Sequence, residues 1–229
     1  MQANIEQLQR ILIFAHLERS DLLRLQPHAV LHQYIKDEII MYDGDHLQAG
    51  LYAIVSGSIR VSKMATTGKE TIFRSLAVGE IFAAPALFGN GIAPATVTAQ
   101  EDSQIVIVAR EALLDAIRAT PEVAFQILSL FNQRLQQMHQ TIHGLVSERA
   151  IVRLVHYIQY FAAEQGITST PEGDYLHAHL SYYQIARSIG ITYEECVRLF
   201  KQLQPIVHYQ RGGKILVKDW AQLAAIEEL

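Results

Sequence analysis

The sequence holds a single cysteine, Cys196, among its 229 residues. One thiol cannot close a disulfide within the chain or supply a cysteine-rich zinc or iron–sulfur site. Long hydrophobic runs are also missing, since no apolar stretch approaches the roughly 20 residues that a membrane-spanning helix needs. The first ten residues are polar and lack the basic start and apolar core of a secretion signal. These absences predict a cytoplasmic protein with no membrane partner and no bound cofactor.

The motifs of common enzyme classes are missing as well. The sequence has no glycine-rich phosphate loop, no nucleophile elbow and no carboxylate pair with a supporting base. We therefore expect a protein that is not an enzyme. His139 and His143 lie four residues apart, a spacing that metal ligands use on a helix, but no third ligand accompanies them. A polar helix surface explains both histidines, and we predict no metal site.

Excess positive charge is lacking too, because the net charge is −4. Its distribution along the chain is uneven. Between residues 181 and 218, six basic side chains stand against two acidic ones, so this segment carries +4 and the remainder −8. A basic C-terminal segment on an otherwise acidic chain is expected when only one domain meets the phosphates of a nucleic acid.

Short runs rich in β-branched residues dominate the N-terminal half and alternate with turns rich in glycine and aspartate. We predict strands at 30–35, 38–42, 50–55, 58–64, 70–76, 96–99 and 104–109. Many short strands at near-regular spacing indicate an all-β sandwich or barrel. Helices are predicted before these strands, at 5–14 and 19–25, and after them at 110–119.

A long helix is predicted from Pro121 to Leu145, with Thr120 as its N-cap. Its apolar residues recur every three or four positions and form one narrow stripe, which begins at Val123 and Ile127. A stripe of this length and width is typical of a coiled-coil seam. The alternative is a long core helix within one domain. The seam residues that we predict are Phe131, Leu135, Met138, Ile142 and Leu145.

The C-terminal part predicts a winged helix-turn-helix. After a helix at 147–165 and a loop at 168–174, capping boxes begin at Ser181 and Thr192, with Gly190 between them. Two short helices joined in this way form a helix-turn-helix whose second helix enters the major groove of DNA. Strands at 206–209 and 214–217 then flank a basic hairpin tip. A helical hairpin used for packing or protein contact is the alternative. Cys196 falls among apolar positions, which predicts a buried structural thiol.

The motifs, in this order, resemble the cyclic-AMP receptor protein/fumarate–nitrate regulator (Crp/Fnr) family of bacterial transcription factors. The matching stretches include the Asp-Gly-Asp turn at 43–45, residues 50–61, Gly79-Glu80, residues 148–154 and residues 185–198. The resemblance implies an α+β fold with a β-roll at 1–120, a dimerisation helix at 121–145 and a winged helix-turn-helix at 146–229. It also implies a homodimer on a palindromic operator of double-stranded DNA, an effector sensed by the β-roll, and RNA polymerase as a further partner.

The effector pocket that the resemblance implies departs from the cyclic-nucleotide pattern. Members that bind such a nucleotide carry Gly-Glu, then Arg-Ser or Arg-Thr, where this chain has Ala83-Ala84 and Pro94-Ala95. A buried phosphate without a cationic partner is strongly disfavoured. The resemblance therefore predicts a retained fold without a response to cyclic AMP. The degenerate pocket would comprise Gly79, Glu80, Ala83, Ala84, Pro94, Ala95, Met138 and His139.

The DNA-reading positions are partly retained. The family pattern Arg-Glu-x-x-x-Arg becomes Tyr193-Glu194-Glu195-Cys196-Val197-Arg198. Glu194 can accept from cytosine, Arg198 can donate to guanine or phosphate, and Tyr193 replaces a guanine-reading arginine. The predicted DNA contacts are Tyr182, Gln184, Thr192, Tyr193, Glu194, Arg198, Lys201, Arg211 and Lys214. A second hypothesis stays open, in which the protein is a small-molecule sensor or scaffold whose C-terminal module contacts protein.

Overall fold

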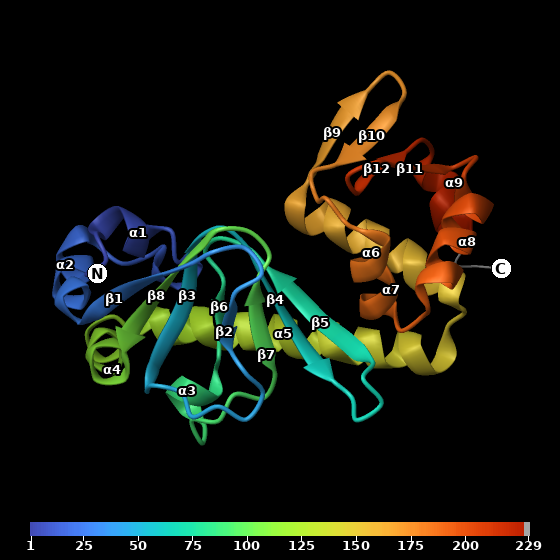
Figure 1. Ribbon diagram of the computed structural model, residues 1–229. Coiled ribbons are helices and arrows are strands. Elements are labelled where there is room, and N and C mark those ends of the chain that lie inside the picture. Colours follow the sequence, from blue (N-terminus) through green and yellow to red (C-terminus); the bar gives the residue numbers. More distant parts are fainter. Residues whose placement is uncertain (227–229) are drawn as a thin grey trace. The chain divides into compact units, whose positions relative to one another are not determined.

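The computed structural model describes residues 1–226, without the side chains of Gln140 and Leu145. Packing divides the chain into two compact units, Met1–Leu135 and Gln136–Leu229. The division falls inside one long helix, α5 (Glu122–Ser147), which Figure 1 shows in green and yellow. The expected three-part division at residues 120 and 145 stays a prediction. None of the described helices is long and apolar enough to cross a membrane.

The N-terminal unit contains the predicted β-roll, built from two four-stranded antiparallel sheets. The first has the order β1 (Ala29–Tyr34), β8 (Ser103–Ala109), β3 (Gly50–Ser56), β6 (Ile81–Phe82). The second has the order β2 (Ile39–Met41), β7 (Thr96–Ala99), β4 (Ile59–Met64), β5 (Glu70–Leu76). All seven predicted strands are confirmed, with ends within one residue of the prediction. The two-residue strand β6 is too short for a pattern and was not predicted.

The first sheet is buried on both faces, which explains why its central strands β3 and β8 are almost continuously apolar. Leu51, Ala53 and Val55 point into a core shared with the N-terminal helices. Tyr52 and Ile54 point the other way, into the core between the two sheets. The strand period of two therefore separates two hydrophobic cores within one unit.

The helices of the N-terminal unit agree with two of the three predictions. They are α1 (Ile5–Gln9), the 3-10 turns η1 (Leu12–Phe14) and η2 (Gln26–His28), α2 (Arg19–Leu25), α3 (Pro85–Phe88) and α4 (Arg110–Ala119). The predicted continuous helix at 5–14 is wrong. Ile11 adopts an extended conformation, and the N–H of Leu12 donates to the carbonyl of Gly79 at 3.0 Å. This contact with a distant turn replaces a helical hydrogen bond.

Helix α5 buries its apolar stripe at one end only. Val123 and Ile127 are 1% and 3% exposed and belong to the N-terminal core. Further along, Leu135 and Ile142 are more than half exposed. Phe131 lies between these regimes, half-buried and edge-on to Phe88 at 6.2 Å. The core-helix alternative thus describes only the beginning of α5. The side chain of Leu145 lies outside the described part of the structure.

The C-terminal unit contains the predicted winged helix-turn-helix. Its elements are α6 (Ala150–Gln165), β9 (Ile167–Thr170), β10 (Gly173–Leu176), α7 (Tyr182–Ile189), α8 (Tyr193–Leu203), β11 (Val207–Gln210), β12 (Lys214–Val217) and α9 (Trp220–Ala225). The strands form one sheet in the order β11-β12-β10-β9. The predicted loop at 168–174 is wrong because it forms most of the β9–β10 hairpin. Its strand β10 also pairs with β12, opposing Tyr175 to Leu216, a long-range contact that local composition does not show.

Two turns of the β-roll provide a matched test of this packing. Gly57 and Gly68 have nearly equal φ values, +79° and +78°, in the left-handed region. A Cβ on Gly57 would lie 2.4 Å from Ser103 Oγ and 2.6 Å from the carbonyl oxygen of Asp102, whereas one on Gly68 would meet nothing within 4 Å. Gly68→Ala should therefore cost only conformational strain, about 1–2 kcal/mol.

Gly57→Ala should cost about 1–3 kcal/mol more than Gly68→Ala, because the backbone of the neighbouring strand must move. Urea unfolding of both variants measures the difference. Equal losses of unfolding free energy would show that the β3–β4 turn is not packed as described.

Candidate nucleic-acid interface and ligand cavity

Local hydrogen bonds fix the ends of the two helices in the helix-turn-helix. Ser181 Oγ accepts from the N–H of Gln184, and Gln184 Oε1 accepts in return from the N–H of Ser181, which confirms the first capping box. Gly190 ends α7 in the left-handed conformation. The second box is half formed: Thr192 Oγ1 accepts from the N–H of Glu195, but the carboxylate of Glu195 points to Arg198.

Helix α8 has one buried and one exposed face. Cys196, Leu199, Phe200 and Leu203 are buried in the C-terminal core. The predicted DNA contacts of this helix and its N-cap are all exposed: Thr192, Tyr193, Glu194, Arg198 and Lys201. Residues 194, 198 and 201 follow helical spacing, so they share one face. The buried thiol that the sequence predicts is confirmed, and burial raises the pKa of Cys196 to about 12.

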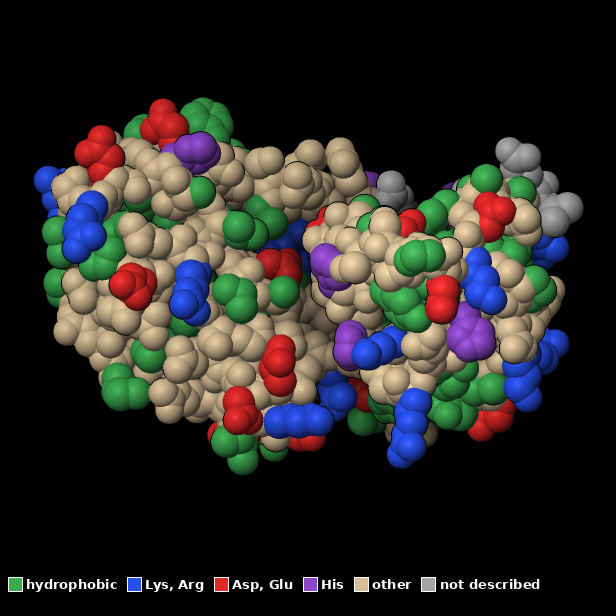
Figure 2. Space-filling model, turned by 90° about the horizontal axis from the view of Figure 1, so that it is seen from above, with side chains coloured by type: hydrophobic (Ala, Val, Ile, Leu, Met, Phe, Trp, Pro, Cys, Tyr) green, Lys and Arg blue, Asp and Glu red, His purple; other side chains and the backbone are tan. Residues whose placement is uncertain are grey.

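The wing adds basic side chains beside this helix. Arg211 and Lys214 are exposed at the turn between β11 and β12. The face of the C-terminal unit that Figure 2 shows carries several Lys and Arg side chains, in blue, among hydrophobic ones. Exposed lysine and arginine side chains on a helix face and on a neighbouring wing are suited to phosphate contacts.

Tyr182 packs between the helices and the wing. Its ring stacks on that of Tyr209 with centroids 3.8 Å apart, and it meets Phe200 and Tyr193 edge-on at 5.3 and 5.9 Å. Desolvation raises the pKa of Tyr182 to about 12. The ring thus contributes to the hydrophobic cluster that fixes the wing against α7 and α8. The predicted phosphate contacts of Tyr182 and Gln184 stay predictions. The amide oxygen of Gln184 accepts from the N–H of Ser181 at the start of α7.

Arg198 is held loosely on the exposed face. Its Nη2 lies 3.4 Å from Glu195 Oε1, one turn earlier, and its side chain is 73% exposed. An exposed ion pair of this kind contributes about 0–1 kcal/mol at most. Arg198 can therefore exchange Glu195 for a phosphate or a base edge at small cost.

The N-terminal unit contains a cavity of about 140 Å³. It lies where the family comparison of the sequence places the effector pocket, since Ala83, Ala84, Pro94 and Ala95 form part of its wall. The full set of described lining residues is Met41, Val61, Arg74, Phe82, Ala83, Ala84, Pro85, Pro94, Ala95, Val97 and Arg134. Ala84 has no carboxylate to bind a ribose hydroxyl, and Pro94 has no guanidinium to neutralise a phosphate.

Gly79 and Glu80, which were also predicted for the pocket, do not line this cavity. The N–H of Gly79 donates to the carbonyl of Ile54, and Glu80 Oε2 accepts from the N–H of Ala77, so both residues build the turn before β6. Met138 and His139 belong to the C-terminal unit. Their role as effector contacts stays a prediction.

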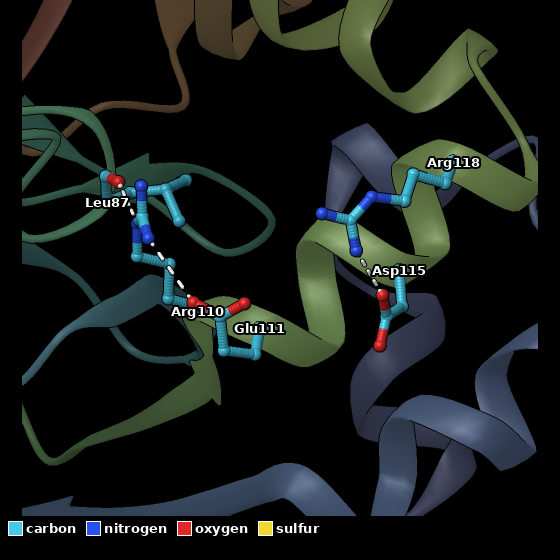
Figure 3. A network of polar contacts seen from close by, with 5 residues as sticks. All are labelled: Leu87, Arg110, Glu111, Asp115 and Arg118. Atoms are coloured by element: carbon cyan, nitrogen blue, oxygen red, sulfur yellow. Dashed lines mark hydrogen bonds and ion pairs between the residues drawn. The ribbon is translucent and has the colours of Figure 1, made fainter.

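The backbone next to the cavity keeps a glycine-like conformation. Ala83 has φ +53°, one of two non-glycine residues with positive φ among those described. Helix α3 begins two residues later, at Pro85. Arg110 anchors this helix, because its Nε donates to the carbonyl of Leu87 at 2.9 Å (Figure 3). The segment thus combines a left-handed backbone at Ala83 with side chains that offer neither a carboxylate nor a guanidinium.

Two arginines in the wall, Arg74 and Arg134, were missed by sequence reasoning. A signal for Arg74 existed: alternation at the end of the strand at 70–76 places it on the same face as Leu76, which is buried. An arginine on the inner face of a strand is unusual. Arg134 carried no comparable signal, because it borders a stripe on a helix with many polar positions.

No group of three or more His, Cys, Asp or Glu side chains in the described residues could hold a metal ion. His143 Nδ1 instead lies 3.7 Å from Glu148 Oε1 near the end of α5.

The burial of Cys196 predicts a thiol that is inert in the folded protein. Only a thiolate reacts, and a pKa of about 12 leaves almost none at neutral pH. Labelling with Ellman's reagent should therefore be slow and should accelerate in urea as the protein unfolds. A cysteine placed at exposed position 202 by Gln202→Cys is the control and should react at once. Equal rates for the two thiols would contradict the buried position.

The strained backbone at Ala83 predicts an unusual response to glycine. Ala83→Gly should relieve about 1–2 kcal/mol of left-handed strain, against about 0.5–1 kcal/mol of added unfolded-state entropy. The variant should thus be as stable as the parent, or slightly more so. Ala116→Gly, in the middle of α4, should lose about 1 kcal/mol. Thermal unfolding compares them, and a similar loss for both would refute the conformation at Ala83.

Known protein families match both halves of the chain. Residues 31–120 match the cyclic nucleotide-binding domain, and residues 152–226 match the Crp-like helix-turn-helix domain. The chain is 24% identical over 191 residues to the cAMP-activated global transcriptional regulator CRP of Haemophilus influenzae, covering 83% of this chain and 84% of that one. It is 32% identical over 123 residues to the cyclic AMP receptor protein of Thermus thermophilus, covering 54% and 56%.

Solved structures show the same fold. A mutant of CooA from Carboxydothermus hydrogenoformans superposes with a TM-score of 0.81 at 20% identity, covering 99% of this chain and 98% of that one. The regulator CLP from Xanthomonas campestris gives 0.73 at 20% identity, covering 88% and 100%. With both domain families matched in the expected order, the chain belongs to the Crp/Fnr family of DNA-binding transcription regulators.

Proposed function

We propose that this protein is a homodimeric regulator that binds a palindromic operator through helix α8 of each subunit and does not respond to cyclic AMP. The observation that carries the proposal is the exposed face of α8, with Glu194, Arg198 and Lys201 in line and the basic wing beside it. Such a face suits the major groove, with the wing on the phosphate backbone. RNA polymerase is the partner that a regulator on DNA would contact.

The exposed part of α5 supports the dimer. Leu128, Leu135 and Ile142 are seven residues apart and are 62%, 51% and 55% exposed, with Met138 between them at 59%. Two helices that carry apolar residues at heptad spacing bury them against each other. Full burial of each such side chain contributes about 1.5–3 kcal/mol, so a second copy along this row would be strongly favoured. Phe131 and Leu145 complete the proposed seam.

The cavity wall supports the loss of the cyclic-AMP response. Ala84 and Pro94 stand where nucleotide-binding members carry a carboxylate and a guanidinium, and both line the cavity. Effectors vary among the relatives: CRP of Haemophilus influenzae is described as cAMP-activated, and CLP as responsive to c-di-GMP. We propose that a different small molecule occupies this site and shifts the subunits toward one DNA-binding state. Such a shift requires the ligand to bind one state more tightly than the other.

Tyr193 supports a half-site that differs from the family pattern. Its ring is 50% exposed at the first position of α8 and rests edge-on against Tyr182. A tyrosine offers one hydroxyl and an apolar ring, where arginine would offer a bidentate contact to guanine. Each bidentate contact contributes about 1–3 kcal/mol of base discrimination, so the preference at this base pair should change.

The test of the proposal is selection of bound sequences from a random pool of duplex DNA by the full-length protein without added ligand. Enrichment of a palindrome with half-sites about one helical turn apart is the expected result. Adding cyclic AMP should leave the enriched sequence and its affinity unchanged. A cyclic-AMP-dependent gain in affinity would overturn the effector part of the proposal. No enrichment of duplex DNA with or without cyclic AMP would favour a protein-binding role for the C-terminal module.

Arg198 and Arg118 form a matched pair for testing the interface. Both are exposed, at 73% and 70%, and each pairs with an acidic residue three positions earlier in its helix. Arg198→Gln should weaken binding to the selected operator by about 1–3 kcal/mol, because a contact to guanine or phosphate is lost. If the contact is to phosphate, the salt slope should also fall by about 1. Arg118→Gln, in α4, should change neither quantity in a fluorescence anisotropy titration. Equal effects of the two substitutions would refute the assignment of Arg198.

A further inference from the structure

The cavity of the N-terminal unit has an apolar wall that contains two arginines. Arg74 comes from β5, opposes Val61 of β4 and lies on the same face of its strand as the buried Leu76. Arg134 comes from α5. Among the described residues that line the cavity, no side chain is acidic, and the remainder are apolar. Two arginines in an otherwise apolar wall favour an anionic ligand.

Arg134 is held in place from two sides. Its Nη2 donates to the carbonyl of Ile81, at the end of the first sheet. Its guanidinium carbon also lies 6.0 Å from the ring centroid of Phe131, at cation–π distance. A guanidinium carries five N–H donors in a rigid plane, so it can serve a carbonyl and a ligand oxygen together. Holding the side chain beforehand reduces the entropy that a ligand must overcome.

The volume of the cavity limits the size of its ligand. Pockets for drug-sized ligands and cofactors measure about 300–1,000 Å³, whereas this cavity measures about 140 Å³. A nucleotide exceeds that space. An inorganic anion would fit, but it would leave Phe82, Val61 and Val97 without an apolar partner. A ligand that contacts both the arginines and the apolar side chains of the wall must be small, with one anionic end and one apolar end.

We propose that this cavity binds a small apolar monocarboxylic acid. Its carboxylate lies against Arg74 and Arg134, and its hydrocarbon body lies against Phe82, Val61 and Val97. Carboxylates match the planar donor fork of arginine, which favours this anion. The inference rests on the proposed function only in taking the cavity as the effector site. In this proposal, Arg74 of β5 and Arg134 of α5 supply positive charge to a cavity that lacks the nucleotide-binding carboxylate at residue 84 and guanidinium at residue 94.

Thermal unfolding of the full chain tests the inference with paired probes. The acids are benzoate, phenylacetate and isocaproate, and each is compared with its neutral amide of the same shape. At least one acid should raise the unfolding temperature in a saturable manner. Its amide should bind about tenfold more weakly or worse, because only the acid pairs with the arginines. Cyclic AMP should produce no shift.

Variants assign the effect to the cavity. Arg74→Gln should weaken the effective acid about tenfold or more, a change worth about 1.4 kcal/mol. Arg134→Lys keeps the charge but removes the planar fork, and it should weaken the acid as well. Arg118→Gln, a distant exposed arginine, should leave the affinity unchanged. Circular dichroism of each variant confirms that it is folded; if Arg134→Lys does not fold, Arg74→Gln decides alone.

Three outcomes would overturn the inference: no acid shifts the unfolding temperature, acids and amides act equally, or Arg118→Gln weakens binding as much as Arg74→Gln. Selection of duplex DNA by the same preparation separates this failure from that of the proposed function. An enriched palindrome without a carboxylate effect rejects the ligand class alone. The absence of any DNA preference rejects the proposed function and leaves carboxylate binding to be judged on its own result.

Discussion

An apolar stripe along a helix has to be buried somewhere, and α5 buries only the first part of its stripe within its own chain. Val123 and Ile127 complete the core beneath the first sheet. From Leu128 onward the row emerges into solvent at heptad spacing. The same helix contributes Arg134 to the cavity wall and continues into the C-terminal unit. One element thus belongs to the N-terminal core, to the cavity wall and to the surface that a second subunit would cover in the proposed dimer.

Helix α8 has one face that packs in the core of the C-terminal unit and one exposed face that carries the proposed DNA contacts. Leu199, Phe200 and the thiol of Cys196 face the core, and the stacked rings of Tyr182 and Tyr209 hold the wing to the helices. The opposite face keeps its polar side chains in solvent. Arg198 is restrained only by an exposed ion pair with Glu195. An exposed ion pair contributes little to stability, so breaking it would cost little if Arg198 turned toward DNA.

Local patterns in the sequence predicted most helices and strands correctly. They failed where a hydrogen bond to a distant segment determines the local structure. Four elements have the predicted ends: the strands at 70–76 and 96–99 and the helices at 19–25 and 110–119. Their apolar periodicity and the turn residues that flank them are both local features of the sequence. The helix predicted at 5–14 breaks because Leu12 bonds to Gly79, and the loop predicted at 168–174 becomes a hairpin because β10 pairs with β12. The alanines of the cavity were found by family resemblance. Its arginines were missed, although alternation placed Arg74 on an inner face.

Sedimentation equilibrium of the full chain tests the central claim, that the exposed row of α5 joins two copies. The account predicts a mass twice the 25.8 kDa of the chain and dissociation to that mass by Ile142→Asp, which places a charge in the seam. Gln133→Asp, on the opposite side of the same helix, should leave the dimer intact. A monomeric parent protein, or a dimer that survives Ile142→Asp, would contradict the account.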